Sequence, residues 1–324
     1  MKILHVTDTH LAPVGSRHRR DDFEAAMFLK LGNVVSTAHA HGVRTIVHTG
    51  DVFDLQNPRG VPRELIHRFG EFLAAHDLQW VLLAGQHDYR GRDPSASRYA
   101  PLSLLQWHPQ VACAAVAEHI TYYDLGQTRI WCVPYSTNLP ELLSSCDLTG
   151  DVLAIHAMLV KEPVPWDHLL LEQVADYGPR LVLSGDYHPG FDPTIVSNLS
   201  FVAVGDSGAV APTGLSATTF SNPGALARTS VSDAGRQPQV ALVDLDSTSV
   251  EYIEIPCSSA SDAFDLGTAA RDKVKDQVRS AFAEKLSELQ FTVEPTWDEL
   301  AEGLRDEDPS VIEKARVYYQ AAQA

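Results

Sequence analysis

Lys2-Ile-Leu-His-Val-Thr7 is an apolar run of β type, and Asp8-Thr-His10 follows it directly. Runs of this composition and length predict β-strands. Further polar motifs also follow β-type runs: Gly50-Asp51, Gly85-Gln-His-Asp88, His156 and Gly185-Asp-Tyr-His188. Side chains that follow strands can converge where the strands end, so this pattern predicts one metal site and, with it, an enzyme.

Composition limits the class of protein. The chain has 324 residues, 44% of them hydrophobic, which is enough for one large domain with a sizeable core plus an appendage. Its four cysteines show no paired spacing, so we expect a reduced, cytoplasmic setting. Because no run approaches roughly 18 apolar residues and no basic segment precedes an apolar one at the N-terminus, we expect neither a membrane span nor export.

The chain is strongly acidic, with a formal net charge of -17 and a pI near 5.1. Contacts to phosphates require clustered Lys and Arg. This charge argues against a protein that coats nucleic acid through bulk electrostatics. Any contact with nucleic acid must therefore be local, or depend on metals or on a partner.

The order of apolar runs predicts an α/β fold. The first half alternates β-type runs, at 2–7, 43–49 and 79–84, with amphipathic stretches. From about residue 116 short β-type runs follow one another, among them 201–204 and 217–220. Two packed sheets with outer helices would account for both halves. Beyond Ser258, helical spacing connects Val274, Val278, Phe282, Leu286 and Leu289, and Pro295 and Pro309 separate shorter helices. We expect a catalytic domain over residues 1–258 and a helical appendage over residues 259–324.

The motif residues are carboxylates, imidazoles and one amide. This mixture suits Mn²⁺, Fe²⁺ or Zn²⁺ better than ions that seek thiolates. Two cations about 3.5–4 Å apart, bridged by a carboxylate, can generate a hydroxide nucleophile and hold both oxygens of a phosphoryl displacement. A phosphoester is the natural substrate. Each motif is weak alone, since Gly-Asp is more often a turn than a ligand, but their joint order is specific.

In this order the motifs resemble the calcineurin-like metallophosphoesterases, whose pattern is DxH, GD, GNHD or GNHE, a lone His, then GHxH. The resemblance covers roughly residues 1–225. Three flanking details look like the SbcD-type branch of DNA-repair exonucleases: Asp8-Thr-His-Leu11, Gly50-Asp-Val-Phe-Asp54 and Asn222-Pro-Gly-Ala-Leu-Ala-Arg228. The resemblance implies a double β-sheet sandwich flanked by helices, and hydrolysis of DNA phosphodiesters with two divalent ions, Mn²⁺ above all.

The resemblance also assigns roles to residues. It places the first ion on Asp8, His10, Asp51 and His188. It places the second on Asp51, Gln86, His156 and Asp186. By the same carry-over His87 is catalytic, assisting phosphate binding or protonating the leaving oxygen, and Asp88 orients the ring of His87.

Two positions depart from the family pattern. Gln86 stands where the family has Asn, and its side chain is longer by one carbon, roughly 1.5 Å. Asp186 stands where the GHxH motif has its first His. Both side chains still offer oxygen, so we expect a harder and more negative second site that favours Mn²⁺ or Mg²⁺ over Zn²⁺.

Basic residues near the motifs are candidates for substrate contacts. Arg17, Arg19 and Arg20 follow the first motif, where they could contact DNA phosphate or form a solvated turn. The loop after the third motif is a second candidate for contact with substrate, through Arg90 above all, and it also carries Tyr89, Arg92 and Arg98.

The leading hypothesis is a cytoplasmic DNA exonuclease or endonuclease of repair or recombination. Its expected partners are DNA, an SbcC-type coiled-coil ATPase and a second copy of the chain, without a membrane. One alternative is a phosphodiesterase or phosphatase for a small molecule. The other is a non-catalytic scaffold that binds DNA or a partner and has a degenerate second metal site.

Overall fold

The computed structural model describes residues 1–117, 119–204, 209–288, 296–305 and 309–322. The chain divides into two compact units, Met1–Phe264 and Asp265–Ala324. Leu289, and the side chains of Val278, Phe282 and Leu286, lie outside the described part.

The first sheet has six strands in the order β14-β13-β1-β2-β3-β4. Strands β1, β2, β3 and β4 are parallel, and β13 and β14 continue the sheet in antiparallel pairing. In β2 every residue is buried, as is typical of a parallel strand covered on both faces. The bounds are β1 Lys2–Val6, β2 Thr45–His48, β3 Gln79–Leu83, β4 Val111–Ala115, β13 Gln239–Asp244 and β14 Val250–Glu254.

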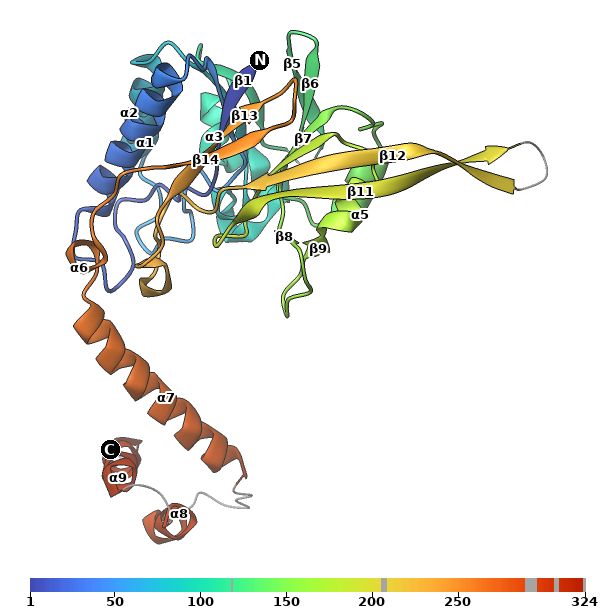
Figure 1. The fold of residues 1–324 in the computed structure, drawn as a ribbon. Helices are drawn as coiled ribbons and strands as arrows, with labels where there is room; N and C mark the ends of the chain where they lie inside the picture. Colours follow the sequence, from blue (N-terminus) through green and yellow to red (C-terminus); the bar gives the residue numbers. More distant parts are fainter. Residues whose placement is uncertain (118, 205–208, 289–295, 306–308, 323–324) are drawn as a thin grey trace. The chain divides into compact units, whose positions relative to one another are not determined.

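The second sheet has six strands in the order β11-β12-β10-β7-β6-β5. Strands β12, β10, β7 and β6 are parallel, while β5 and β11 pair antiparallel at the two edges. Figure 1 shows β11 and β12 running on beyond the rest of this sheet. The bounds are β5 Thr121–Leu125, β6 Thr128–Val133, β7 Val152–His156, β10 Leu181–Gly185, β11 Phe191–Val204 and β12 Ala209–Asn222.

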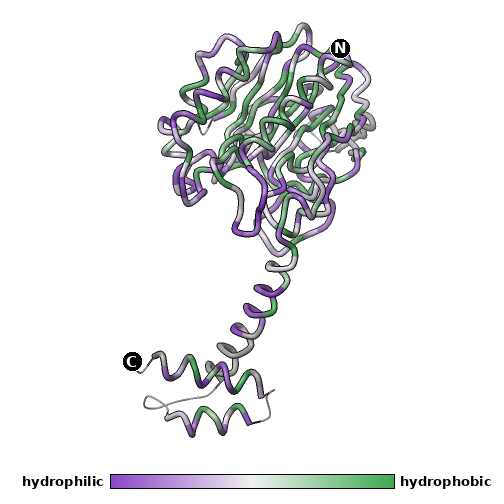
Figure 2. Tube along the Cα trace, turned by 90° about the vertical axis from the view of Figure 1, so that its left-hand side faces the viewer, coloured by the Kyte–Doolittle hydropathy of each residue, from purple (hydrophilic) through white to green (hydrophobic). Residues whose placement is uncertain are grey.

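The two sheets pack face to face. Ile3, Val47 and Val81 from the first sheet meet Val152 and Leu181 from the second in one buried cluster. Helices α1 (Phe23–Ala40), α2 (Arg63–Ala74) and α3 (Pro101–Leu105) cover the outer face of the first sheet, and α4 (Leu139–Ser144) and α5 (Leu171–Ala175) cover the second. Figure 2 shows the apolar strands inside and the polar segments outside. The expected α/β double sandwich flanked by helices is confirmed.

Several short elements were not expected from the sequence. Strand β4 contains three alanines and one cysteine, which carry little β signal. Within the described residues, the connecting segments also form β8 (Leu159–Val160), β9 (Leu169–Leu170) and the 3-10 helices η1 (Gln86–Asp88), η2 (Arg90–Arg92), η3 (Pro94–Tyr99) and η5 (Val231–Asp233). The short helix α6 (Ala260–Ala263) lies in the segment that was expected to be helical.

The second unit is helical. It contains α7 (Leu266–Glu288), α8 (Trp297–Gly303) and α9 (Pro309–Ala322). Thr296 and Glu299 form a capping box that starts α8, and the rings of Trp297 and Tyr319 lie 5.8 Å apart between α8 and α9. In the described part of the chain, no helix combines the length and the apolar character needed to cross a membrane.

Candidate metal centre

The polar motifs meet at one edge of the sandwich because strands of both sheets end there. Backbone hydrogen bonds join the loops after β1 and β2, among them those from Asp8 N to Gly50 O (3.1 Å) and from His10 N to Asp51 O (2.9 Å). A further bond joins the two sheets, since Asp186 N donates to the Asp8 carboxylate at 3.2 Å. Loops from distant parts of the sequence are therefore fixed against one another.

Two glycines permit this close approach. A Cβ on Gly85 would lie 2.1 Å from Oδ1 of Asp51, and a Cβ on Gly50 would lie 2.1 Å from Nδ1 of His156. Gly50 also has a φ of 107°, a conformation that other residues rarely adopt. Any larger residue at either position would push a motif side chain aside.

Four motif residues have left-handed backbone conformations. Their φ angles are 52° at Asp8, 44° at His10, 52° at Asp51 and 76° at Asp186. Such conformations are uncommon outside glycine and cost on the order of 1 kcal/mol or more each. The fold keeps this strain at one edge, which is a feature of functional sites.

Asp8, His10, Asp51 and His188 form a compact group whose potential ligand atoms all lie within 4.8 Å of one another. His10 Nε2 lies 3.6 Å from Asp51 Oδ2, and His188 Nε2 lies 3.8 Å from Asp8 Oδ1. Oδ1 of Asp8 and Oδ2 of Asp51 are buried and have no hydrogen-bond partner. A buried carboxylate oxygen is costly unless it is paired. A divalent cation fits this group.

The pKa values in this group agree with that fit. Burial raises the pKa of Asp51 to about 8. A strong positive charge is therefore needed to keep this carboxylate ionised at neutral pH. Burial, together with neighbouring histidines, holds the pKa of His10 well below its usual value. Neutral imidazole is the form that binds metals.

Asp51, Gln86, His156 and Asp186 lie beside this group. Nδ1–H of His156 donates to the carbonyl of Thr49 at 2.7 Å, so Nε2 is the nitrogen left for a metal. Burial lowers the pKa of this ring, but the charges of Asp51, Asp186 and Asp8 outweigh burial and raise the pKa to about 9, so a bound cation would take the place of a proton on Nε2. That Nε2 is buried, lacks a hydrogen-bond partner and lies 3.6 Å from Oδ1 of Asp51. The other oxygen of Asp51 faces His10, so one carboxylate faces both groups of residues.

The two departures from the family pattern contact each other. Nε2 of Gln86 donates to Oδ1 of Asp186 at 2.8 Å. The longer amide therefore reaches the carboxylate that replaces the family histidine. The amide oxygen of Gln86 is the atom suited to a cation.

The partner of the His87 ring differs from the sequence expectation. Nδ1 of His87 is 2.9 Å from Oδ1 of Asp54, so Asp54, not Asp88, holds the ring. The Asp88 carboxylate is buried and accepts backbone N–H groups of Val52, Phe53 and Gly85 at 2.7–3.1 Å. Asp88 therefore holds the loops that contain Val52 and Gly85 together. The expectation that it orients the His87 ring is corrected.

Several opposing effects set the pKa of His87. Burial alone lowers it, but the hydrogen bond to Asp54 and the charges of Asp51 and Asp54 outweigh burial, so the pKa is raised. His87 also lies against His10, with ring centroids 4.7 Å apart.

Arg19 is not available to a substrate. Its side chain is 3% exposed and pairs with Asp21 at 2.6 Å, and its guanidinium lies over the rings of Phe23 and Phe264. The expected phosphate contact is therefore corrected, because the charge is already paired and desolvated. Arg17 and Arg20 are exposed.

A cleft of about 610 Å³ opens beside Gln86, His156 and Asp186. Of the arginines expected near the substrate from the loop after the third motif, Arg92 lines the cleft, whereas Arg90 is an exposed neighbour in the same helix η2. Its other lining residues are Tyr135, Ser136, Thr137, Leu139, Pro140, Ala157, Met158, Trp166, Asp167, His168 and Leu169.

Sequence reasoning missed two residues as site candidates, Asp54 and Trp166. Asp54 ends the run Gly50-Asp-Val-Phe-Asp54, so a signal for it existed. Trp166 is 65% exposed, and no periodicity marks it.

Comparisons with known proteins give a family and partial relatives. The sequence profile described as calcineurin-like phosphoesterase matches residues 1–190. DNA double-strand break repair protein Mre11 of Sulfurisphaera tokodaii is 27% identical over 183 residues, which is 54% of this chain and 45% of that protein. The SbcD component of nuclease SbcCD from Escherichia coli K12 is 38% identical over 88 residues, 27% of this chain and 21% of that protein. The matched part thus spans less than half the length of either relative.

Among solved structures, a dimetal phosphatase from Danio rerio aligns with a TM-score of 0.45 and 13% sequence identity. That alignment covers 79% of this chain and 99% of the phosphatase.

Proposed function

This chain belongs to the calcineurin-like phosphoesterases, as the match over residues 1–190 shows, and from that premise we propose that it is a metal-dependent nuclease. The proposed reaction is hydrolysis of DNA phosphodiesters in repair or recombination, as an exonuclease or endonuclease. The observation that carries the hydrolytic part is the compact group of Asp8, His10, Asp51 and His188 with its unpaired carboxylate oxygens. The partial likeness to a DNA double-strand break repair protein and to a nuclease subunit supports the choice of DNA.

We propose two divalent ions, with Mn²⁺ preferred. Asp8, His10 and His188 would hold one, Gln86, His156 and Asp186 the other, and Asp51 both. When bound, the ions supply an activated nucleophile and offset the charge that develops on the phosphoryl oxygens. The oxygen-rich second group, with a carboxylate at position 186, favours a hard ion.

His87 is the proposed catalytic residue that does not bind metal. Asp54 fixes Nδ1, so Nε2 is the atom that can protonate the leaving oxygen or contact the phosphate. Asp54 acts through His87 and is a positioning residue.

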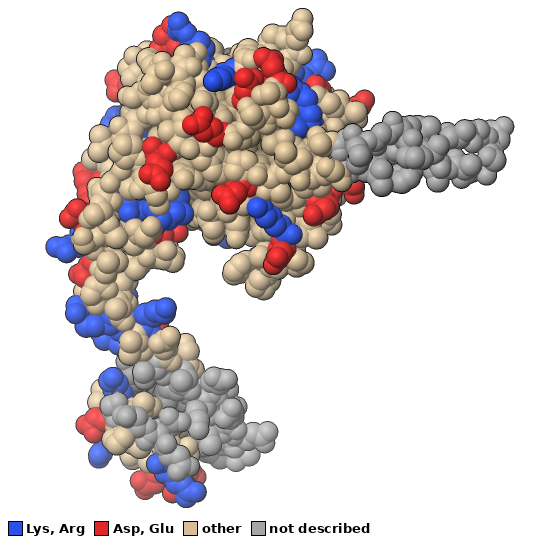
Figure 3. All heavy atoms as spheres, viewed as in Figure 1, with Lys and Arg blue, Asp and Glu red and all other residues tan. Residues whose placement is uncertain are grey.

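The proposed substrate path is the cleft beside Gln86, His156 and Asp186. Arg92 offers a cation for a phosphate, and Trp166 offers an exposed aromatic face for a base. On the face drawn in Figure 3, the Lys and Arg side chains of residues 1–264 are interspersed with Asp and Glu. Local contacts of this kind, rather than a broad basic field, are what an acidic nuclease requires.

Two rival functions each have one observation in their favour. The cleft of about 610 Å³, a size that suits a small ligand, and the acidic charge favour a small-molecule phosphodiesterase or phosphatase. The bond between Gln86 and Asp186 favours a scaffold with a degenerate second metal site, because it engages two of the four expected ligands.

One comparison separates the three functions. Purified protein with Mn²⁺ is given linear duplex DNA, a cyclic nucleotide and a generic aryl phosphodiester. A nuclease cleaves the DNA, a small-molecule enzyme prefers the cyclic nucleotide, and a scaffold turns over none. Failure to cleave DNA alongside turnover of the cyclic nucleotide would overturn the nuclease proposal.

The proposed setting is the cytoplasm, with a homodimer and an SbcC-type coiled-coil ATPase as partners. The support is the likeness to one component of nuclease SbcCD over 88 residues. We propose a phosphoesterase domain over residues 1–258 and the helices beyond it, over residues 259–324, for packing, dimer contacts or partner docking. Mass photometry of the chain alone and with a candidate ATPase tests this assignment.

A further inference from the structure

The segment 224–228, which follows β12, lies between the two loops that carry Asp8 and His188. Three consecutive backbone N–H groups in it donate to carbonyls of these loops, each at 3.0 Å. The pairs are Ala225 to His188, Leu226 to Thr7 and Ala227 to Asp8. Two of the four residues proposed to hold the first ion therefore have their backbones fixed by this segment.

Gly224 shows how closely the segment lies against the second loop. It has a φ of 78°, and a Cβ at this position would lie 2.8 Å from the carbonyl oxygen of His188. Its N–H is held by the side chain of Asn222 at 2.9 Å. The segment thus cannot move without moving the His188 loop.

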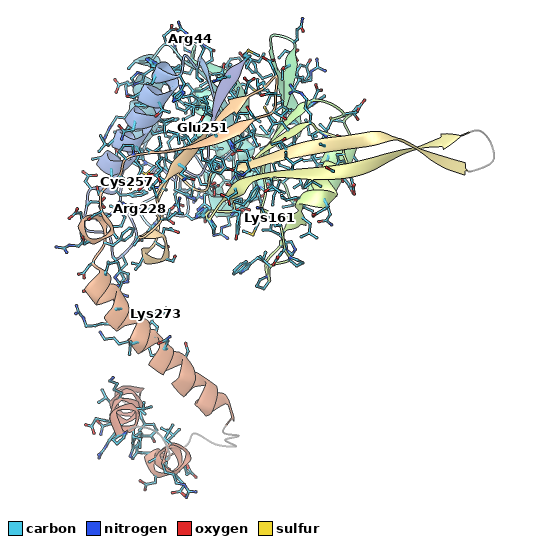
Figure 4. All side chains as sticks on the ribbon, viewed as in Figure 1. Arg44, Lys161, Arg228, Glu251, Cys257 and Lys273 are labelled. Atoms are coloured by element: carbon cyan, nitrogen blue, oxygen red, sulfur yellow. The ribbon has the colours of Figure 1, made fainter. Side chains whose placement is uncertain are left out.

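The carbonyl side of the same segment is held by cations. Lys30 Nζ donates to Leu226 O at 2.8 Å, and Arg19 donates to Arg228 O at 2.5 Å. The two terminal nitrogens of Arg236 donate to the carbonyls of Ala225 and Ala227. Four consecutive carbonyls, 225 to 228, therefore each accept a hydrogen bond from a cationic side chain. Arg228 itself, labelled in Figure 4, donates to Ala234 O and Ser258 O.

Placing these cations here is costly for the fold. Lys30 is 3% exposed and Arg228 is 3% exposed. A buried cation is destabilising unless hydrogen bonds compensate for lost solvation, and an apolar side chain would fill the space at lower cost. Burial, with help from the nearby Arg228, lowers the pKa of Lys30 to about 7. A role beyond packing would explain why the cations are present.

We propose that Lys30 and Arg236 are positioning residues for the first metal site. They hold the carbonyls of the 224–228 segment, and the opposite N–H groups of that segment hold the backbones of Asp8 and His188. This inference rests on the proposed metal centre. Neither cation donates a hydrogen bond to a ligand side chain, so both act on the ligands through the backbone of the segment, and Arg236 also acts on Asp8 through its charge. Loss of either one frees carbonyls of the segment, allowing the loops to separate and the first ion to bind more weakly.

Metal affinity, measured without substrate, tests this proposal. Mn²⁺ alone is titrated into metal-free protein by calorimetry, and bound Mn²⁺ is followed by electron paramagnetic resonance. We expect Lys30→Met and Arg236→Met to lower the affinity for the first Mn²⁺ ion roughly 10-fold. This is the size of effect that is typical when a group that supports a metal ligand is removed. His188→Ala identifies which binding step belongs to the first site.

Arg180→Met is the matched control. Arg180 is also half-buried and also donates to a backbone carbonyl, that of Leu245, but it lies outside the 224–228 segment. Arg236→Lys provides a conservative variant that keeps the charge but reaches one carbonyl, so its loss of affinity should be smaller than that of Arg236→Met. Thermal melting checks that each variant is folded, and Arg236→Lys carries the test if Lys30→Met does not fold.

The outcomes are distinguishable. A wild type that binds no Mn²⁺ overturns the proposed function itself. A wild type that binds Mn²⁺, with folded Lys30→Met and Arg236→Met that bind it equally well, overturns only this inference. An equal loss in Arg180→Met also overturns it, because the effect would then be general loosening of the fold.

Discussion

The hydrogen bond between Asp54 and the ring of His87 orients that ring. Changes at either residue should therefore lower the rate without emptying a metal site. Removing a positioned general acid typically costs about 10² to 10⁴ in rate. We therefore expect His87→Ala to lose rate by that amount while its metal content stays intact. Asp54→Asn should give a smaller loss of kcat with little change in KM, because an amide can still contact Nδ1. Turnover of an aryl phosphodiester and metal analysis of the same samples measure both effects. A parallel fall of metal content in His87→Ala would place His87 among the ligands.

In the proposed two-ion centre, Asp186 sets which metal the second position prefers. Its carboxylate adds negative charge and accepts a hydrogen bond from Gln86 at 2.8 Å. Asp186→His introduces the family residue and breaks that bond, so we expect Zn²⁺ to displace Mn²⁺ more readily than in the wild type. Competition between the two ions, read by elemental analysis, measures the shift. Asp186→Asn is the control, since it removes the charge without adding an imidazole. Unchanged competition in Asp186→His would show that residue 186 does not contact the second ion.

Strand β1 carries a buried histidine, His5, that makes the stability of the fold depend on pH. The His5 ring contacts Oγ1 of Thr49 at 2.9 Å and Oγ of Ser221 at 3.2 Å, and burial lowers its pKa to about 3. The pKa of His48 in β2 is also lowered to about 3 by burial. The unfolded chain binds protons at these rings below about pH 6.5, whereas the folded chain does not until about pH 3.

The contribution of His5 and His48 to stability should therefore be complete above pH 6.5 and be lost as the pH drops from 6.5 toward 3. Each histidine contributes on the order of 1 kcal/mol per pH unit. Denaturant unfolding at several pH values measures the slope. His5→Gln keeps hydrogen-bonding atoms but does not titrate, so its slope should be shallower. An identical slope in wild type and His5→Gln would refute this account.

The connection between β8 and β9 carries Trp166 into the cleft. Stacking of one base on an aromatic ring is worth about 1–3 kcal/mol. We expect Trp166→Ala to raise KM roughly 10-fold for thymidine 5′-p-nitrophenyl phosphate, and to leave methyl p-nitrophenyl phosphate, which has the same leaving group and no base, unaffected. Trp107→Ala is the control, because Trp107 is 84% exposed and does not line the cleft. Equal changes for both substrates would rule out base stacking.

Local sequence predicted the elements whose signal is local. The runs 2–7, 43–49 and 79–84 correspond to β1, β2 and β3, because buried parallel strands are continuous apolar runs. Strand β4 was not predicted, because its alanines and cysteine have little β propensity and form a strand through pairing with β3. Strands β11 and β12 are longer than the runs 201–204 and 217–220, since antiparallel pairing extends them through polar residues.

Contacts between distant residues explain what the sequence could not predict. Strand ends indicated where the motif side chains gather, because the period and direction of strands are local properties. The Asp88 carboxylate accepts hydrogen bonds from Val52 and Phe53, which lie more than thirty positions away in the sequence. The ring that packs on the guanidinium of Arg19 belongs to Phe264, the last residue of the first unit. Only the folded chain assigns these partners, so the roles of Asp88 and Arg19 had to be corrected.

The charge of the whole molecule predicts that DNA binding depends on metal. A net charge of -17 repels phosphates, and two divalent ions would supply positive charge at the site where DNA must come closest. We expect EDTA to lower the affinity for a duplex with phosphorothioate ends at least about 10-fold. With Mn²⁺ present, the logarithm of affinity should fall with the logarithm of salt with a slope of about -3 or shallower, because roughly three phosphates would be neutralised.

Fluorescence anisotropy with labelled duplex measures both quantities. Asp51→Asn should bind DNA as weakly in Mn²⁺ as the wild type does in EDTA, since the residue proposed to face both ions is lost. Asp77→Asn makes the same charge change at a side chain that is 90% exposed and precedes β3, away from the strand ends, and should bind like the wild type. Tight binding in EDTA with a steep salt slope would mean that basic residues elsewhere bind the DNA. The metal centre would then contribute to cleavage and not to affinity.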